Sequence, residues 1–103
     1  MKKLFVDDNR KKPENGYDCA EDYYEAVRLL ERNNYDFASF DYDLGVGQNG
    51  LQVLIWMKQN GKYIPRINIH SSHSLGRSQM KNYCETNFPG VKVTMEPFDY
   101  SKK

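Results

Sequence analysis

Short apolar runs that stop at acidic residues are the clearest pattern along the chain. Residues 4–6 form an apolar triplet that ends at Asp7, and residues 37–40 form a second run that ends at Asp41. A short run that is apolar almost throughout is typical of a strand buried on both faces. We therefore predict two central strands, each followed immediately by an acid.

Two later segments alternate apolar and polar residues instead. They cover residues 67–70 and 91–95, and such alternation predicts strands with only one buried face. Residues 17–19 have the length of a further, very short strand. The chain therefore offers four predicted strands and one short one.

Segments with apolar residues at helical spacing separate these strands. The spacing predicts three helices, over residues 20–33, 51–57 and 75–87. Residues 9–16 predict a loop. Strands that alternate with helices indicate an α/β fold with a parallel sheet, in which chemistry gathers at the carboxyl ends of the strands.

The composition limits the class of protein. With 103 residues, 39% of them hydrophobic, the chain predicts one domain over residues 1–103. A net charge of +1 argues against binding nucleic acid through excess positive charge, and we expect no sequence-specific DNA binding. No apolar run approaches the ~20 residues of a membrane span, and the N-terminus lacks a signal-peptide pattern. Cys19 and Cys84 lie far apart, which indicates free thiols and a cytoplasmic location.

Four acids follow the two central strands. Asp7 and Asp8 follow the first strand, and Asp41 and Asp43 follow the second. Because neighbouring parallel strands end at the same edge of a sheet, these carboxylates should form an oxygen-rich cluster that accepts a hard cation such as Mg²⁺. Without a cation, their repulsion would cost stability and raise at least one pKa. The alternative is that these acids only end the strands in solvent.

The same residues carry a resemblance to the receiver domain of response regulators. The resemblance rests on residues 4–8, 20–41, 41–45 and 50. It implies a flavodoxin-like α/β fold, with a parallel sheet in the strand order 2-1-3-4-5. It also implies that Asp7 and Asp8 bind Mg²⁺ (or Mn²⁺), that Asp41 is the phosphoacceptor and a metal ligand, and that the backbone carbonyl of Asp43 ligates the metal.

Two departures from the receiver pattern point to a divergent branch. Glu96 stands where a receiver has the lysine that binds the phosphoryl group, and an acid cannot neutralise an aspartyl phosphate. His70 stands where a receiver has a serine or threonine at the end of the fourth strand. Together with the Asp-Asp-Asn-Arg sequence at residues 7–10 and the His70-Ser71 pair, these departures resemble the cyclic-phosphate processing receiver-like domain. That family is expected to handle cyclic phosphate ends of nucleotides or RNA.

This chemistry assigns roles to further polar residues. Opening a cyclic phosphodiester requires neutralised phosphate oxygens, an activated water and a proton for the leaving oxygen. A cation held by the aspartates would neutralise the phosphate, and His70 and His73 would transfer protons. Ser71 would donate a hydrogen bond in the catalytic site, and Arg10 and Ser72 would bind the substrate phosphate. Each side chain also has a simpler alternative as a loop residue or a surface ion-pair partner.

Two functions from different classes remain open. The first is a metal-assisted phosphoesterase that processes or hydrolyses cyclic phosphate ends of nucleotides or RNA. The second is a non-catalytic receiver-like signalling or binding module, either with Asp41 as phosphoacceptor or as a pseudo-receiver. The sequence leaves open whether Glu96 joins the site.

The sequence also lacks two helices of a typical receiver. Only residues 9–16 separate the acidic pair from the second strand, and six residues follow Pro97. In receivers those two helices cover the same face of the sheet. We therefore predict a reduced fold with three helices on one face. The other face would be covered partly by residues 9–16, the tail, a second copy of the chain or a partner protein.

Overall fold

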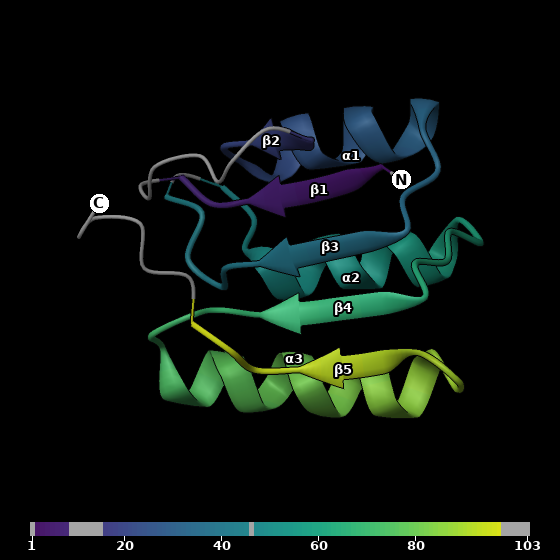
Figure 1. Cartoon of the computed structure of the whole chain (residues 1–103). Coiled ribbons are helices and arrows are strands. Elements are labelled where there is room, and N and C mark those ends of the chain that lie inside the picture. The colour runs from purple at the N-terminus through teal and green to yellow at the C-terminus, as the bar shows by residue number, and fades with distance from the viewer. Residues whose placement is uncertain (1, 9–15, 46, 98–103) are drawn as a thin grey trace.

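Strands and helices alternate along the chain as the sequence predicts (Figure 1). The computed structural model describes residues 2–8, 16–45 and 47–97. In order, these residues form β1 (Lys3–Val6), β2 (Tyr17–Ala20), α1 (Tyr23–Arg32), β3 (Phe37–Phe40), α2 (Gly50–Gln59), β4 (Arg66–Ile69), α3 (Ser74–Asn87) and β5 (Lys92–Thr94). Residues 9–15 of the predicted loop, including Arg10, lie outside the described residues.

The five strands form one parallel sheet in the order β2-β1-β3-β4-β5, which confirms the predicted fold class. Val6 pairs with Phe40, and Phe40 pairs with Ile69. β1, β3 and β4 therefore end level with one another in the middle of the sheet. The residues that follow these three strands meet at one edge.

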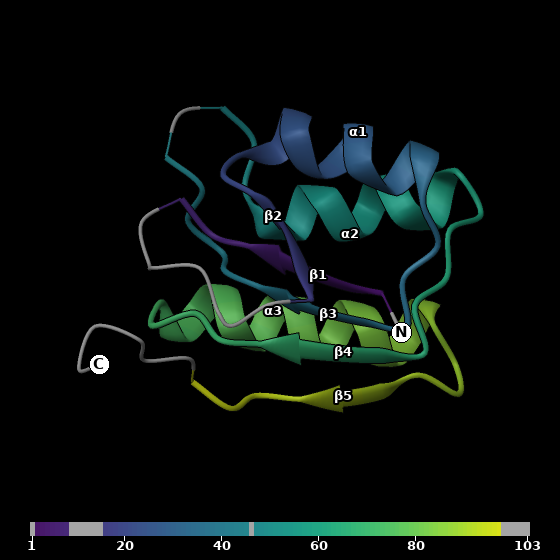
Figure 2. The ribbon, with the colours of Figure 1, turned by 45° about the horizontal axis from the view of Figure 1, so that its top comes forward.

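All three helices lie on the same face of the sheet (Figures 1 and 2). No helix of the described segments covers the opposite side, which we call the helix-free face. This arrangement confirms the prediction of three helices on one face of the sheet. Whether residues 9–15 or the tail cover the helix-free face lies outside the described residues.

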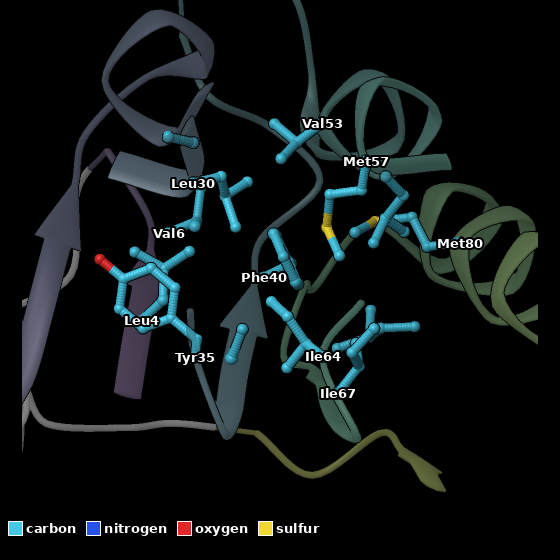
Figure 3. Packing of buried hydrophobic residues seen from close by; sticks show 14 of the residues in the cluster. Leu4, Val6, Leu30, Tyr35, Phe40, Val53, Met57, Ile64, Ile67 and Met80 are labelled. Atoms are coloured by element: carbon cyan, nitrogen blue, oxygen red, sulfur yellow. The ribbon is translucent and has the colours of Figure 1, made fainter. Parts of the chain in front are cut away.

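The hydrophobic core fills the space between the sheet and the helices (Figure 3). Alternate strand residues, such as Leu4 and Val6 of β1, point into it and pack against helix residues such as Leu30 and Met57. Side chains alternate between the two faces of a strand, so the intervening strand residues face the other way. The core therefore accounts for one face of the sheet only.

Capping residues set the helix starts. The Asp22 side chain accepts a hydrogen bond from the Glu25 backbone, so α1 begins at Tyr23 rather than at residue 20 as predicted. The Asn49 side chain does the same for α2, accepting from the backbone of Gln52. Among the described segments, no helix combines the length and apolar character needed to cross a lipid bilayer.

One inference from alternation is wrong for β4. The polar residues Asn68 and His70 were expected on an exposed face, but both are buried. Burial of a polar side chain is tolerated when its hydrogen-bonding groups are satisfied, and both side chains have several partners. At this point of the helix-free face, the buried side chains are polar and are satisfied by hydrogen bonds to one another and to neighbouring groups.

Candidate active site

The backbone ladder of the sheet continues past the strand ends and brings three side chains together. The backbone N–H of Asp41 donates to the Val6 carbonyl at 2.9 Å, and that of His70 donates to the Phe40 carbonyl at 3.0 Å. The N–H of Asp7 donates to the Ala20 carbonyl at 3.0 Å. Asp7, Asp41 and His70 therefore lie side by side after β1, β3 and β4. We call these three residues the acid–histidine cluster.

The cluster is compact and almost fully buried. One potential ligand atom from each residue lies within 4.8 Å of the others. The exposed fractions are 4% for Asp7, 6% for Asp41 and 2% for His70. Burial raises the pKa of the Asp41 carboxyl, and the nearby Asp7 charge raises it further. The opposing effects of His70, of a hydrogen bond from Ser71 and of the Tyr42 backbone are smaller, so this carboxyl is costly to ionise in the protein alone.

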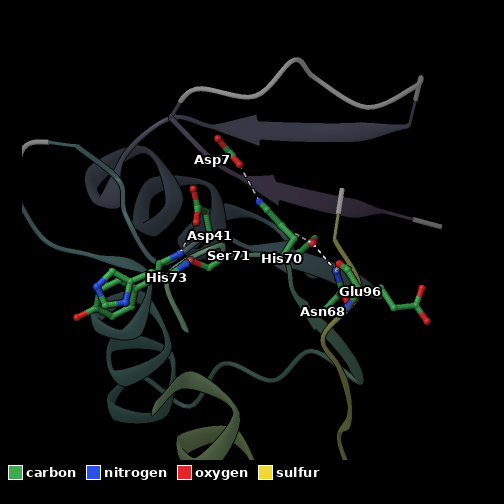
Figure 4. A network of polar contacts seen from close by, with 9 residues as sticks. Asp7, Asp41, Asn68, His70, Ser71, His73 and Glu96 are labelled. Carbon is green, nitrogen blue, oxygen red and sulfur yellow. Dashed lines mark hydrogen bonds and ion pairs between the residues drawn. The ribbon is translucent and has the colours of Figure 1, made fainter. Parts of the chain in front are cut away.

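His70 is held on both ring nitrogens (Figure 4). Its Nε2 lies 2.8 Å from Oδ2 of Asp7, and its Nδ1 lies 2.7 Å from Oγ of Ser39. The ring also stacks on Phe5, with 4.9 Å between the ring centroids. The imidazole therefore has a fixed orientation, with one nitrogen turned toward the acids and the other toward the sheet interior.

Asn68 connects Ser39 to the backbone that follows β5. Its Oδ1 accepts from the Glu96 backbone at 2.8 Å and from the Thr94 hydroxyl at 2.6 Å. Its Nδ2 donates to the Glu96 carbonyl at 2.8 Å and to Ser39 Oγ at 3.0 Å. Because the amide orientation is fixed by Glu96, Ser39 accepts from Asn68, and the same hydroxyl lies 2.7 Å from Nδ1 of His70. Since an ionised carboxylate only accepts hydrogen bonds, Nε2 of His70 would be the donor to the Asp7 carboxylate.

The donor set suits a hard divalent cation. Asp7 and Asp41 offer carboxylate oxygens, the ligands that Mg²⁺ and Mn²⁺ prefer, and a cation would relieve the repulsion that raises the Asp41 pKa. Both nitrogens of His70 are engaged by protein groups. Its geometry therefore favours a role in orienting Asp7 over direct binding of a metal.

Two glycines allow the loops around the cluster to pack closely. A Cβ on Gly50 would overlap the carbonyl of Asp41, and a Cβ on Gly76 would overlap the ring of Tyr42. The Gly50 N–H also donates to the Tyr42 carbonyl at 2.8 Å. The loop after β3 therefore packs closely against the first turns of α2 and α3, and this packing holds the backbone of Asp41 in place.

The other predicted metal residues lie outside the buried cluster. Asp8 is exposed, and its carboxylate lies against Gly45, where an added Cβ would be 2.9 Å from Asp8 Oδ2. Asp43 is exposed in the same loop after β3. The two residues therefore flank the cluster on the solvent side, and their metal-binding roles stay predictions.

The loop after β4 divides the predicted catalytic residues into two groups. The buried Ser71 hydroxyl donates to Asp41 and accepts from the His73 backbone at 3.0 Å. His73 is exposed and caps α3, because its Nδ1 accepts from the Gly76 N–H at 2.9 Å. Its ring stacks on Tyr42, with 4.8 Å between the centroids. Ser72 is exposed, so Ser71 alone of these three reaches the cluster.

Sequence reasoning missed Ser39, Asn68 and Arg77. Arg77 donates from Nη1 to the Ser71 carbonyl at 3.0 Å and so braces the loop after β4. Ser39 and Asn68 each lie two residues before a cluster residue, Asp41 and His70 respectively, and therefore on the same face of the sheet. The sequence did offer one signal for Ser39 and Asn68. Each is a polar residue inside a mostly apolar strand, two positions before a candidate site residue and therefore on the same face.

Glu96 contacts the network through its backbone. Both its N–H and its carbonyl are bound by the Asn68 amide, while its exposed side chain extends away from Asp7 and Asp41 (Figure 4). The carboxylate of Glu96 is therefore not part of the acid–histidine cluster.

The sheet order, the acids after β1 and β3, and the loop after β4 define a receiver-like α/β domain. A similar solved structure is the response regulator protein TrrA from Thermotoga maritima, in complex with Mg(2+)-BeF. It shares 25% sequence identity with this chain at a TM-score of 0.65, and the match covers 99% of this chain and 92% of that one.

The family model described as the cyclic-phosphate processing receiver domain matches residues 2–86. The chain therefore belongs to this family, which confirms the resemblance seen in the sequence. A search of curated proteins gives no significant match.

Proposed function

We propose that this domain processes cyclic phosphate ends of nucleotides or RNA in a metal-assisted reaction at the acid–histidine cluster. The observation that carries the proposal is the burial of Asp7, Asp41 and His70 within 4.8 Å of one another. The two carboxylates can bind a cation, which would also relieve the repulsion that raises the pKa of Asp41. A bound cation would in turn neutralise charge on a phosphate. The family to which the chain belongs supports the same substrate chemistry.

Asp7 and Asp41 would hold Mg²⁺ or Mn²⁺, with Asp8 and the Asp43 backbone at the solvent side. The bound cation would neutralise charge on phosphate oxygens and orient a water. His70 would donate from Nε2 to Asp7, and Ser39 holds the ring at Nδ1. Ser71 orients the Asp41 carboxylate through its hydrogen bond.

The direct test is to incubate the purified protein and Mg²⁺ with 2′,3′-cyclic and 3′,5′-cyclic nucleotides and to follow phosphomonoester formation by ³¹P NMR. We expect turnover of a cyclic substrate that chelation of the metal stops. Asp41→Asn should lower the rate about 100-fold or more, because residues that merely orient metal ligands already contribute about 10–100-fold.

Glu31→Gln provides the matched control for this variant. It also replaces one carboxylate by an amide, but at an exposed position near the end of α1. It should keep at least about half of the wild-type rate. Absence of turnover with every cyclic nucleotide and with both metals would contradict the catalytic proposal.

A second candidate function is phosphorylation-dependent signalling, favoured by one observation. Asp41 is buried at the position of the receiver phosphoacceptor, and the similar TrrA structure holds Mg(2+)-BeF. Against it, position 96 offers no cation, and the Glu96 side chain points away from Asp41. An aspartyl phosphate would therefore lack the positive partner that a lysine supplies.

Incubation with acetyl phosphate and Mg²⁺ separates the two candidates. The catalytic proposal expects little long-lived phosphoprotein in the intact mass spectrum. A stable gain of one phosphate that disappears in Asp41→Asn would support signalling instead.

A further inference from the structure

One row of side chains crosses all five strands on the helix-free face. The register pairs Lys3 with both Tyr17 and Phe37, Phe37 with Arg66, and Arg66 with Lys92. From β2 to β5 the row therefore reads Tyr17, Lys3, Phe37, Arg66, Lys92. We call it the aromatic–basic row. With about 4.8 Å between neighbouring strands, it spans about 19 Å.

Aromatic rings and cations in this row are in contact. Nζ of Lys3 lies 4.6 Å from the centroid of the Tyr17 ring, and the Arg66 guanidinium lies 5.3 Å from that of Phe37. The two rings themselves meet edge to face at 6.3 Å. Arg66 and Lys92 are exposed, and the rings are half-buried. Flat π-surfaces thus lie next to positive charges.

None of the strand residues that face away from the helices is acidic. These residues are Lys3, Phe5, Tyr17, Cys19, Phe37, Ser39, Arg66, Asn68, Lys92 and Thr94. The overall net charge of +1 hides this local excess of positive charge, because the acids lie elsewhere: on the helices, in the loops, after the strands and, for Asp18, on the helix side of β2. A surface of this kind attracts an anionic partner.

A hollow of about 210 Å³ lies along the β5 side of the row. Its lining includes Phe37, Arg66 and Lys92, together with Asn68, Thr94 and the acidic Glu96. An aromatic wall beside two positive charges has the chemistry that recognises a base and its phosphate.

We propose that the aromatic–basic row binds a single-stranded nucleic acid segment. Its rings stack on bases, and Lys3, Arg66 and Lys92 contact phosphates. The row lies four residues before the acid–histidine cluster on the same strands, about 13 Å away. That separation is a few nucleotides long, so a strand on the row can bring its end to the cluster. This last step alone rests on the proposed function.

Other occupants fit the row less well. A second copy packed face to face around a two-fold axis would bring the positive charges of one row against those of the other. An acidic peptide would satisfy the cations but has no bases to stack on Tyr17 and Phe37. Nucleic acid uses both components of the row.

The test is fluorescence anisotropy with a labelled uridine octamer that ends in ordinary hydroxyls, in low salt. The double variant Arg66→Glu/Lys92→Glu should bind about tenfold more weakly or worse, with a shallower salt dependence. Arg28→Glu/Lys58→Glu makes the same charge change at exposed helix positions and should bind within about twofold of wild type. Melting curves check that each variant is folded.

The contribution of stacking has its own matched pair. Phe37→Leu keeps an apolar side chain but loses the ring, and it should weaken binding about fivefold or more. Tyr24→Leu removes an exposed ring from α1 and should have no effect. Equal weakening by both charge variants, or equally tight binding of poly-glutamate or inorganic polyphosphate, would overturn the proposal. So would a dimer in sedimentation that Arg66→Glu/Lys92→Glu dissociates.

The hydroxyl-ended octamer separates this proposal from the proposed function. Binding without turnover of any cyclic nucleotide would sustain the row and contradict the catalytic site. Turnover of cyclic mononucleotides without octamer binding would support the catalytic site and contradict nucleic acid binding by the aromatic–basic row.

Discussion

The two faces of the sheet are both buried at their centre, but by different means. On the helix side, Ile67 and Ile69 pack into an apolar core formed with the three helices. On the other side of the same strand, Asn68 and His70 are equally buried within a chain of hydrogen bonds. Neighbouring residues of β4 thus use apolar contact on one face and directed polar contact on the other.

The difference has an energetic consequence. Apolar burial is nondirectional and roughly proportional to area, so the core tolerates changes in shape that conserve volume. A buried hydrogen bond adds little net stability, but breaking it leaves polar groups without partners or water. The helix face should therefore respond to lost volume, whereas the helix-free face should respond to lost partners.

The largest expected effect is on the helix face. Ile67→Ala removes three buried carbons from the core and should lower the free energy of unfolding by about 2–5 kcal/mol. Urea denaturation followed by far-UV circular dichroism measures this loss. Ile67→Val should cost only about 0.5–1.5 kcal/mol. Equal losses for the two variants would show that volume is not what stabilises this face.

A smaller loss is expected one residue along, on the opposite face. Asn68→Ala removes the amide that satisfies both backbone groups of Glu96, the Thr94 hydroxyl and Ser39. The free energy of unfolding should fall by about 1–3 kcal/mol, the cost of leaving buried polar groups unpaired.

Asn82→Ala is the control for this prediction, because Asn82 is an exposed position of α3. It should change stability by less than about 0.5 kcal/mol. If Asn68→Leu, which fills the volume but cannot hydrogen-bond, proves as stable as wild type, the polar account of this face is wrong.

The same contrast explains what the sequence could predict. Hydrophobic periodicity gave the elements, because apolar burial leaves a regular trace, and acids at strand ends gave Asp7 and Asp41. The polar network left a weaker trace. The resemblance pointed to His70, but Ser39 and Asn68 were missed, since a polar residue in a strand predicts exposure unless its partners are known. Those partners lie 26 to 31 residues apart in sequence and meet only in the folded sheet.

Charge at the acid–histidine cluster gives a third prediction. The pKa of Asp41 is raised in the folded protein, so the folded state binds this proton more tightly than the unfolded state does. Without metal, stability should therefore fall as the pH rises from the ordinary carboxyl value of 3.8, and the penalty is complete above the folded-state pKa. Asp41→Asn removes this penalty and should be more stable than wild type at pH 7 in chelator.

Mg²⁺ should offset the stability difference between wild type and Asp41→Asn. A cation at ten times its dissociation constant adds about 1.4 kcal/mol to the wild type, and the gain should be much smaller in Asp41→Asn. Calorimetric melting with chelator and with millimolar Mg²⁺ measures both effects. A melting temperature that Mg²⁺ leaves unchanged in both proteins would contradict the site.

The smallest expected effect distinguishes the two histidines of the loop after β4. His70 belongs to the buried network, whereas His73 accepts a hydrogen bond from Gly76 at the start of α3. Loss of a helix cap costs about 0.5–2 kcal/mol, so His73→Ala should lower the free energy of unfolding by about 1 kcal/mol. His73→Asn, which supplies another capping oxygen, should restore most of it. If His73→Asn recovers the stability but reduces turnover of a cyclic nucleotide as much as His73→Ala does, then His73 acts in the chemistry as well as at the cap.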